Sequence, residues 1–174
     1  AEAMRSNNAD IKLSVEQLDL SDLSSVLAFS EQFQAKNQTL DLLINNAGIM
    51  IPPYSQTTAG AELQFATNHL GHFALTGQLI GMLTTTPHSR VVTVSSLAHR
   101  RGRIRFEDLN WSRSYSPWGA YGQSKLANLL FCFELDRRLR LTQATTTSIA
   151  AHPGFSSTNI TSESSWMHPA TPRK

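Results

Sequence analysis

Cysteine is almost absent from this sequence of 174 residues, which contains only Cys132. A single cysteine cannot close an intramolecular disulfide, and no Cys and His residues have the spacing of a zinc site, so disulfide and zinc scaffolds are excluded. Long apolar runs are also lacking, since the longest, such as residues 129–133, fall far short of the ~20 residues of a membrane helix. No signal peptide opens the sequence. We therefore expect a cytoplasmic protein with no bound metal and no membrane segment in this chain, while an anchor that precedes the sequence stays an open alternative.

Charged residues are scarce, at 16% of the chain with a formal net charge of +2, whereas soluble proteins typically contain about 25%. Hydrophobic residues make up 40% and are spread throughout, which excludes a generally disordered chain. The basic run at residues 99–105 has no interleaved aromatic side chains, so it favours a solvated loop over a nucleic-acid site. We expect one globular domain over residues 1–160. An irregular tail is expected over residues 161–174, which show no apolar periodicity.

Short apolar runs alternate with longer stretches of helical periodicity, which is typical of βαβ units and a parallel sheet. The runs are rich in branched and leucine side chains, as strands of a buried parallel sheet are. The pattern therefore predicts an α/β fold. The expected strands are residues 12–18, 40–44, 90–94 and 146–150, and the expected helices run from an N-cap at Ser21 to about Asn37, over about 61–83 and over about 119–141.

Polar, glycine-containing or turn-forming residues follow each expected strand. Ligands of open α/β sheets bind beyond the carboxyl ends of the strands, so these positions form a candidate ligand rim. Turn formation explains any one of these segments alone, but four together favour a site. The segments are Asp19-Leu20, Asn45-Asn46-Ala47-Gly48, Ser95-Ser96 and His152-Pro153-Gly154.

Tyr121 and Lys125 are four residues apart on the third expected helix, so their side chains share one face. A nearby ammonium group lowers the pKa of a phenol from its usual ~10, which suits a tyrosine for proton exchange near neutral pH. This spacing occurs often by chance, and its context has to support it. Ser96 at a strand end could bind a carbonyl oxygen, and Asn68 is an unusual choice in the middle of a helix.

Five motifs, in this order, resemble the short-chain dehydrogenase/reductase family. Within the family, four stretches look most like the retinol-dehydrogenase-like subgroup, and these are Asn68–Phe73, Ser96–His99, Ser124–Asn128 and His152–Gly154. The resemblance covers roughly residues 15–160 and is specific because all five motifs occur together. They are Asn45-Asn46-Ala47-Gly48, Asn68-His69-Leu70-Gly71-His72-Phe73, Val94-Ser95-Ser96, Tyr121-Gly122-Gln123-Ser124-Lys125 and Pro153-Gly154.

The resemblance implies an oxidoreductase that moves a hydride between NAD or NADP and a lipophilic carbonyl or alcohol substrate, and a full-length protein that forms a homo-oligomer. It implies that Tyr121 is the general acid/base and that Lys125 lowers the pKa of Tyr121 and holds the nicotinamide ribose. Ser96 would bind the substrate oxygen, and Asn68 would support a water linking Lys125 to solvent. The implied cofactor-binding residues are Asp19, Leu20, Asn45, Ala47, Gly48, Tyr121, Lys125, Pro153, Gly154 and Thr158.

The sequence departs from the family at both ends. No Gly-x-x-x-Gly-x-Gly turn, which seats the pyrophosphate on a helix N-terminus, follows any expected strand. We therefore expect an incomplete Rossmann-like doubly wound parallel sheet, a three-layer α/β/α fold that lacks strands 1, 2 and 7. Residues 1–160 would form a partial dinucleotide-binding domain, in which the strand at residues 12–18 has lost its neighbours. The choice between NAD and NADP stays open because the residues that decide it follow the missing second strand.

Two other functions compete with this interpretation. One is a catalytically inactive fragment that retains only the helices by which family members dimerise, and the missing phosphate-binding turn favours it. The other is an epimerase or dehydratase with the same Tyr-x-x-x-Lys chemistry, which the Asn45–Gly48 motif together with Asn68 disfavours.

Overall fold

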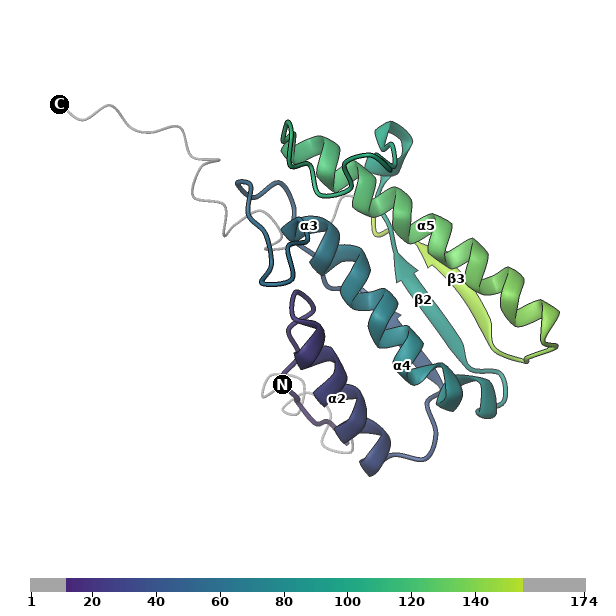
Figure 1. The fold of residues 1–174 in the computed structure, drawn as a ribbon. Coiled ribbons are helices and arrows are strands. Elements are labelled where there is room, and N and C mark those ends of the chain that lie inside the picture. The colour runs from purple at the N-terminus through teal and green to yellow at the C-terminus, as the bar shows by residue number, and fades with distance from the viewer. Residues whose placement is uncertain (1–11, 155–174) are drawn as a thin grey trace.

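The computed structural model describes residues 12–154, which form a parallel sheet covered by helices (Figure 1). The first and second strands are joined through a helical segment whose winding changes from α to π and back to α. The second and third strands are joined through a short 3-10 helix and one long α-helix. In chain order the elements are α2 (Leu23–Lys36), β1 (Leu42–Asn45), α3 (Leu63–Phe65), a π-helical segment (Ala66–Leu70), α4 (Gly71–Thr85), β2 (Arg90–Val94), a 3-10 helix (Leu97–Arg101), α5 (Pro117–Leu141) and β3 (Thr147–Ala151).

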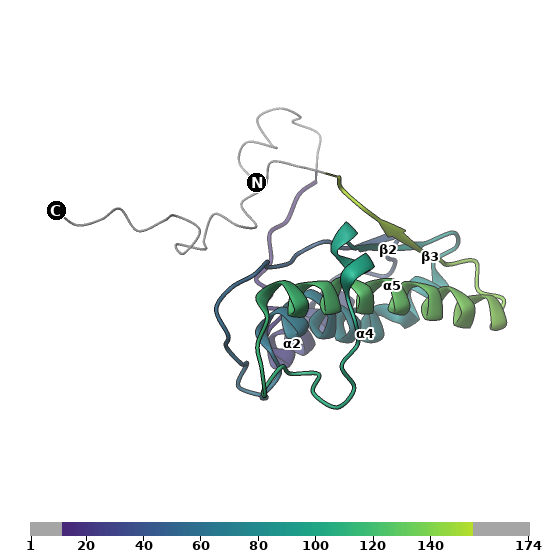
Figure 2. The same cartoon turned by 90° about the horizontal axis from the view of Figure 1, so that it is seen from above.

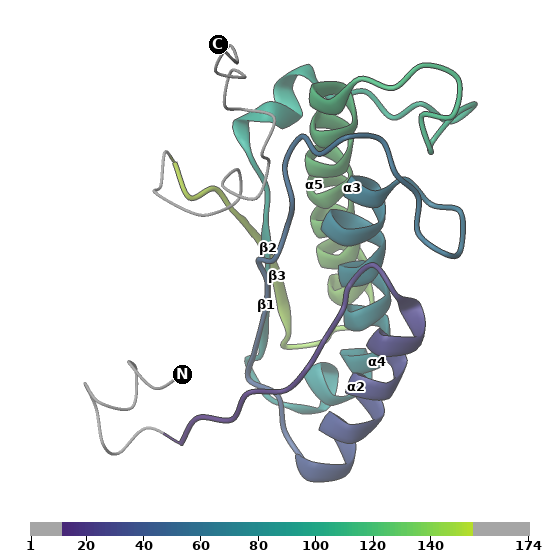
Figure 3. The same ribbon diagram turned by 90° about the vertical axis from the view of Figure 1, so that its left-hand side faces the viewer.

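The three strands are parallel and lie in the order β1-β2-β3, with Ile44 beside Val92 and Val92 beside Ile149. Figures 2 and 3 show α2, α4 and α5 as one layer on a single face of this sheet. On the other face Leu42, Ile44 and Ile149 remain about half exposed, at 48%, 55% and 46%. The expected incomplete Rossmann-like α/β fold is confirmed, and residues 12–154 supply one of its two helical layers.

The strand predicted at residues 12–18 is wrong, because this segment forms neither strand nor helix. An isolated strand leaves its backbone groups without a ladder partner, and no strand among the described residues pairs with this segment. Its last residue, Leu18, instead packs against the apolar cluster between α2 and α4. That cluster consists of Leu20, Val26, Leu75 and Leu79, all less than 9% exposed.

The predicted helices are confirmed with shifted ends. Asp22, not Ser21, caps α2, because its carboxylate accepts the backbone N–H of Ser24 at 2.9 Å, while the Ser21 hydroxyl donates to Asp19. Helix α5 begins at Pro117, two residues before its predicted start. There the Ser116 hydroxyl accepts the Gly119 N–H and the proline ring occupies a position that needs no backbone donor.

The helix predicted over residues 61–83 is interrupted, since residues 66–70 are wound as a π-helix between α3 and α4. A π-helical insertion leaves the surrounding apolar periodicity nearly unchanged, so the sequence pattern cannot reveal it. Such insertions frequently lie at functional sites. Here the π-helical residues include Asn68, which is fully buried.

Candidate active site

The carboxyl ends of the parallel strands lie at one edge of the sheet, beside the first turns of α5 (Figures 1 and 3). Ser96 follows β2, while Tyr121 and Lys125 lie on α5, where they are 5% and 3% exposed. Interaction with the Ser96 side chain lowers the pKa of the Tyr121 hydroxyl, so the two side chains are neighbours. The Lys125 ammonium lies 5.6 Å from the centre of the Tyr121 ring. The structure thus brings together three of the four residues for which a catalytic role is predicted.

Hydrogen bonds between the end of β2 and α5 fix this arrangement. The Ser95 hydroxyl donates to the Lys125 carbonyl oxygen at 2.8 Å. The Val94 carbonyl oxygen accepts from Asn128 Nδ2 at 3.2 Å and from Lys125 Nζ at 3.4 Å. Because these bonds join the strand to the middle of a long helix, the position of Tyr121 depends on helix packing rather than on a loop.

Burial shifts the pKa values of Tyr121 and Lys125. Burial raises the pKa of Tyr121 above its usual value, and the hydrogen bond with Ser96 lowers that pKa in part. Desolvation lowers the pKa of Lys125 to about 8. The pKa of Tyr121 is thus raised, whereas the sequence predicted that it would be lowered. The cost of desolvating the phenolate outweighs the stabilisation that Ser96 gives it. Lys125 nevertheless remains mostly an ammonium at pH 7, and it can stabilise a phenolate that forms during reaction.

Asn68 is the fourth residue, and all its side-chain polar atoms are engaged. Asn68 Oδ1 accepts the Ile49 N–H at 2.8 Å. Asn68 Nδ2 donates to the Ile49 carbonyl oxygen at 2.9 Å and to Ser124 Oγ at 3.0 Å, and Ser124 donates in turn to the Tyr121 carbonyl oxygen. The Asn68 side chain therefore ties the segment after β1 to the turn of α5 that carries Tyr121. The role of Asn68 in holding a water stays a prediction.

Gly48 lies against this cluster, where its lack of a side chain matters. A Cβ atom at this position would lie 3.0 Å from Asn68 Oδ1 and 3.5 Å from Lys125 Nζ. The turn after β1 therefore lies so close to Asn68 and Lys125 that a side chain at this position would crowd them. Within the described residues, the Lys125 ammonium donates one hydrogen bond, to the Val94 carbonyl oxygen, which leaves two of its three N–H donors for a ligand hydroxyl.

The other predicted cofactor residues differ in where they lie. Ala47 and the Pro153–Gly154 segment are exposed at the strand ends, with Gly154 at a positive φ of 71°. Asn45 instead points into the interior, where its Nδ2 donates to Thr76 of α4 at 3.0 Å.

Two of the remaining three predicted cofactor residues, Asp19 and Leu20, lie just before α2. Leu20 packs its side chain in the apolar cluster, so only its backbone is available to a ligand. Asp19 accepts bonds from Ser21 next to that cluster. Thr158 lies outside the described residues.

A buried polar network beside the site had not been predicted from the sequence. Glu62 and Gln64 are fully buried at the start of the helix that carries Asn68, and both contact Tyr115 in the loop that leads to α5. The signal in the sequence is two long polar side chains in an otherwise apolar stretch, with Gln64 four residues before Asn68. That spacing places Gln64 on the same helical face as Asn68.

Residues 1–168 match the family model described as short chain dehydrogenase. The chain belongs to the short-chain dehydrogenase family. It is 48% identical over 164 residues to retinol dehydrogenase 12 of Mus musculus, an alignment that covers 94% of this chain and 51% of the relative. The chain thus spans about half the length of the curated relatives that it matches, and the family is one of NAD(P)-dependent oxidoreductases.

Solved structures of the short-chain dehydrogenase fold agree with this assignment. The chain superposes with a TM-score of 0.79 on an uncharacterized protein from Mycobacterium paratuberculosis, at 50% identity and with 93% of this chain and 58% of that chain covered. It also superposes on the RhlG/NADP complex of Pseudomonas aeruginosa, with a TM-score of 0.63, 22% identity and coverage of 84% and 54%. The second likeness shows the fold alone.

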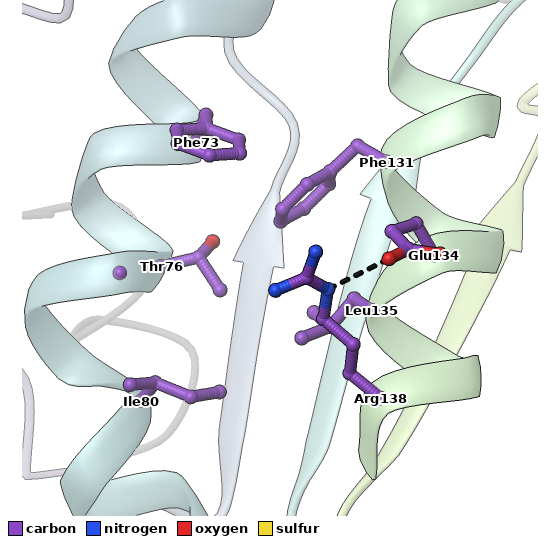
Figure 4. Close-up of a pocket in the computed structure, with 8 residues that line it drawn as sticks. Phe73, Thr76, Ile80, Phe131, Glu134, Leu135 and Arg138 are labelled. Atoms are coloured by element: carbon purple, nitrogen blue, oxygen red, sulfur yellow. Dashed lines mark hydrogen bonds and ion pairs between the residues drawn. The ribbon is translucent and has the colours of Figure 1, made fainter. Parts of the chain in front are cut away.

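A separate hollow of ≈ 270 Å³ lies between α4 and α5, along the length of the two helices (Figure 4). Figure 4 shows the side chains of α4 on one side and those of α5 on the other, with Arg138 reaching Glu134 at 2.7 Å. Its lining residues are Phe73, Thr76, Gly77, Ile80, Phe131, Glu134, Leu135 and Arg138. None of them is Ser96, Tyr121 or Lys125, so this hollow is distinct from the candidate active site. No helix within residues 12–154 has the length and apolar character needed to cross a membrane.

Proposed function

We propose that the protein of which this chain is part interconverts a carbonyl and an alcohol with NAD(P)(H), and that Tyr121 transfers the proton. The position of the Lys125 ammonium, 5.6 Å from the ring of the buried Tyr121, is the observation that supports this function most directly, and Ser96 at the end of β2 acts on the same hydroxyl. The competing proposal, an inactive fragment, concerns the 174-residue chain itself, and assays of this chain beside the full-length protein decide between the two.

A bound nicotinamide would supply or accept the hydride at the substrate carbon. In the direction of reduction, the Tyr121 hydroxyl gives its proton to the carbonyl oxygen as the carbon–oxygen double bond becomes single. Ser96 hydrogen-bonds the same oxygen, and Lys125 stabilises the phenolate that remains on Tyr121. Oxidation of the alcohol reverses each step, with the phenolate as the base.

The residues present fit the nicotinamide end of the cofactor. Gly48 lies close to Lys125, and two N–H donors of the Lys125 ammonium make no hydrogen bond to the described residues. These two donors suit the two hydroxyl groups of a ribose. We infer NAD or NADP as the cofactor, from the family and from these donors. The pyrophosphate would have to be held by residues that this sequence does not contain, because it has no Gly-x-x-x-Gly-x-Gly turn.

We infer a lipophilic alcohol or aldehyde of the retinol type as the substrate. The support is the identity of 44% to 48% to relatives named retinol dehydrogenase. Two aromatic side chains beside the site are consistent with an apolar ligand. Trp118 is 61% exposed and packs edge-on against Tyr121, and Tyr54 lies in the segment after Gly48 and is 41% exposed.

The test uses the full-length protein with retinol or retinal and each dinucleotide. Tyr121→Phe removes the proton donor and should lower kcat by about 10² or more. Ser89→Ala removes a buried hydroxyl at the opposite end of β2, away from Ser96, Tyr121 and Lys125, and should leave kcat within about twofold of the wild type. Turnover retained by Tyr121→Phe would overturn the assignment of the general acid/base.

We further propose that the full-length protein is a homo-oligomer and that the outer faces of α4 and α5 form the contact. Large apolar side chains are exposed on these faces, with Phe73 at 56%, Leu130 at 50% and Phe133 at 64%. Sedimentation of the full-length protein should show a dimer or larger species, and Phe133→Glu should shift it towards the monomer. A wild type that sediments as a monomer at all concentrations tested would refute this contact.

A further inference from the structure

Three segments that are far apart in the sequence meet at the fully buried side chain of Gln64. Gln64 Oε1 accepts the N–H of Ile51, in the segment after Gly48, at 2.8 Å. Gln64 Nε2 donates to the Tyr115 hydroxyl at 2.9 Å and to the Pro117 carbonyl oxygen at 3.0 Å. Both N–H groups of the amide and its carbonyl oxygen are therefore engaged, one of them with the first residue of α5.

Tyr115 and Glu62 complete this network. The Tyr115 hydroxyl donates to the Pro52 carbonyl oxygen at 2.9 Å and lies 3.4 Å from Glu62 Oε1. The carboxylate of Glu62, which is fully buried, accepts the backbone N–H groups of Gln64 and Phe65 at the start of α3. Desolvation and the charge of Glu62 raise the pKa of Tyr115 to about 12, so this hydroxyl keeps its proton over the whole physiological range.

The network precedes the active-site contacts by one helical turn on both helices. Gln64 is four residues before Asn68, and Pro117 is four residues before Tyr121. The contact between Gln64 and Pro117 is followed by the contact between Asn68 and Ser124, which lies four residues further along the helix of Asn68 and seven residues, about two turns, further along α5. Because two contacts at different levels join the same two helices, they limit how far α5 can slide or rotate against the helix that carries Asn68.

A purely apolar contact would not limit the helices in this way. Buried polar groups cost free energy unless they are hydrogen-bonded, and an apolar side chain of the same shape can stabilise a fold equally well. A fully satisfied polar network also fixes the relative positions of the three segments, because its hydrogen bonds form in only one arrangement of them. Gln64, Tyr115 and Glu62 satisfy this condition at residues that lie next to the catalytic turn.

We propose that Gln64 and Tyr115, supported by Glu62, are positioning residues that set the place of the Tyr121 hydroxyl relative to Ser96 and to the turn at Gly48. They touch none of the reacting atoms and act through the first turn of α5 and the segment 49–52. This inference rests on the proposed function, because it assigns the network a part in the reaction of Tyr121.

The test compares three variants of the full-length protein. Tyr115→Phe removes one hydroxyl, and Gln64→Met keeps the length of the side chain but removes its hydrogen bonds. Ser89→Ala is the matched control, because Ser89 is also fully buried and its hydroxyl makes two bonds, to Leu83 and Thr146, at the opposite end of β2. Tyr115→Phe and Gln64→Met should lower kcat about tenfold or more with a smaller change in KM, whereas Ser89→Ala should lower the melting temperature only.

A second measurement separates positioning from stability and does not need turnover. Tyr121 is titrated by NMR in protein with ¹³C-labelled tyrosine, and its signal is assigned with Tyr121→Phe. Tyr115→Phe should shift the pKa of Tyr121, and Ser89→Ala should leave it unchanged.

The inference is overturned if folded Tyr115→Phe has the kcat and the Tyr121 titration of the wild type, and this variant decides the question if Gln64→Met does not fold. If the wild type turns over no substrate, the proposed function fails, and the titration still tests the network.

Discussion

Replacing Gly48 by alanine tests the close contact between the turn after β1 and the catalytic cluster. The added Cβ atom would lie 3.0 Å from Asn68 Oδ1, which is closer than ordinary van der Waals contact, so one of the two must move by a few tenths of an ångström. The Asn68 side chain cannot move freely because it makes hydrogen bonds of 2.8, 2.9 and 3.0 Å. Gly48 is not among the residues with positive φ, so its backbone does not resist alanine.

The expected cost follows from these contacts. Overpacking a filled site typically costs about 1–3 kcal/mol, and alanine recovers about 0.4–1 kcal/mol by restricting the unfolded chain. We therefore expect Gly48→Ala to lower the free energy of unfolding by about 1–2 kcal/mol. Displacement of Asn68 should also reach Tyr121 through Ser124, so kcat should fall about tenfold or more.

Gly77→Ala is the matched control for this variant. Gly77 lies in α4, and no atom lies within 4 Å of a Cβ placed there. Alanine in the interior of a helix is favoured over glycine by about 0.5–1 kcal/mol, so this variant should be slightly more stable than the wild type. Urea unfolding and steady-state kinetics of the full-length protein measure both quantities. If Gly48→Ala matches Gly77→Ala in stability and activity, the close contact has no energetic consequence and the reasoning is refuted.

Three further predictions concern acid stability, helix capping and cofactor binding. Burial lowers the pKa of His72 to about 4 from 6.5 in the unfolded chain. The contribution of His72 to stability is therefore fully present above pH 6.5 and falls by about 3 kcal/mol as the pH drops to about 4. His72→Gln should flatten this slope in pH-dependent urea unfolding, and an unchanged slope would contradict the prediction. Asp22→Ala removes the N-cap of α2 and should lower the free energy of unfolding in the same assay, and an unchanged free energy of unfolding would contradict the prediction. The 174-residue chain alone should bind neither NAD(H) nor NADP(H) measurably in calorimetry, because it lacks the glycine-rich turn, and saturable binding would show that the turn is dispensable.

Much of the fold could be predicted because apolar runs and helical periodicity report directly on burial. The strands at residues 42–45, 90–94 and 147–151 lie within one or two residues of their predicted ends. The failure at residues 12–18 has a physical cause: the apolar alternation there suits a strand, but strand formation depends on a neighbour that the run itself does not encode.

The candidate site could be predicted only for residues whose separation along the chain implies that they lie close together in the fold. Tyr121 and Lys125 share a helix face, so their proximity follows from the sequence, and the strand end places Ser96 beside them. The network of Gln64 and Tyr115 could not be found in this way, because it joins residues separated by 51 positions. The raised pKa of Tyr121 could not be predicted from the sequence either, because it depends on how deeply helix packing buries the hydroxyl.

Transfer of a labelled hydride tests the central claim most directly. The full-length protein is incubated with retinal and with NADH or NADPH carrying deuterium at the transferable position of the nicotinamide, and the alcohol product is analysed by mass spectrometry. The proposed function predicts one deuterium on the carbinol carbon of the product with the wild type and none above background with Tyr121→Phe. A product without deuterium, or equal labelling by both proteins, would contradict hydride transfer with Tyr121 as the proton donor.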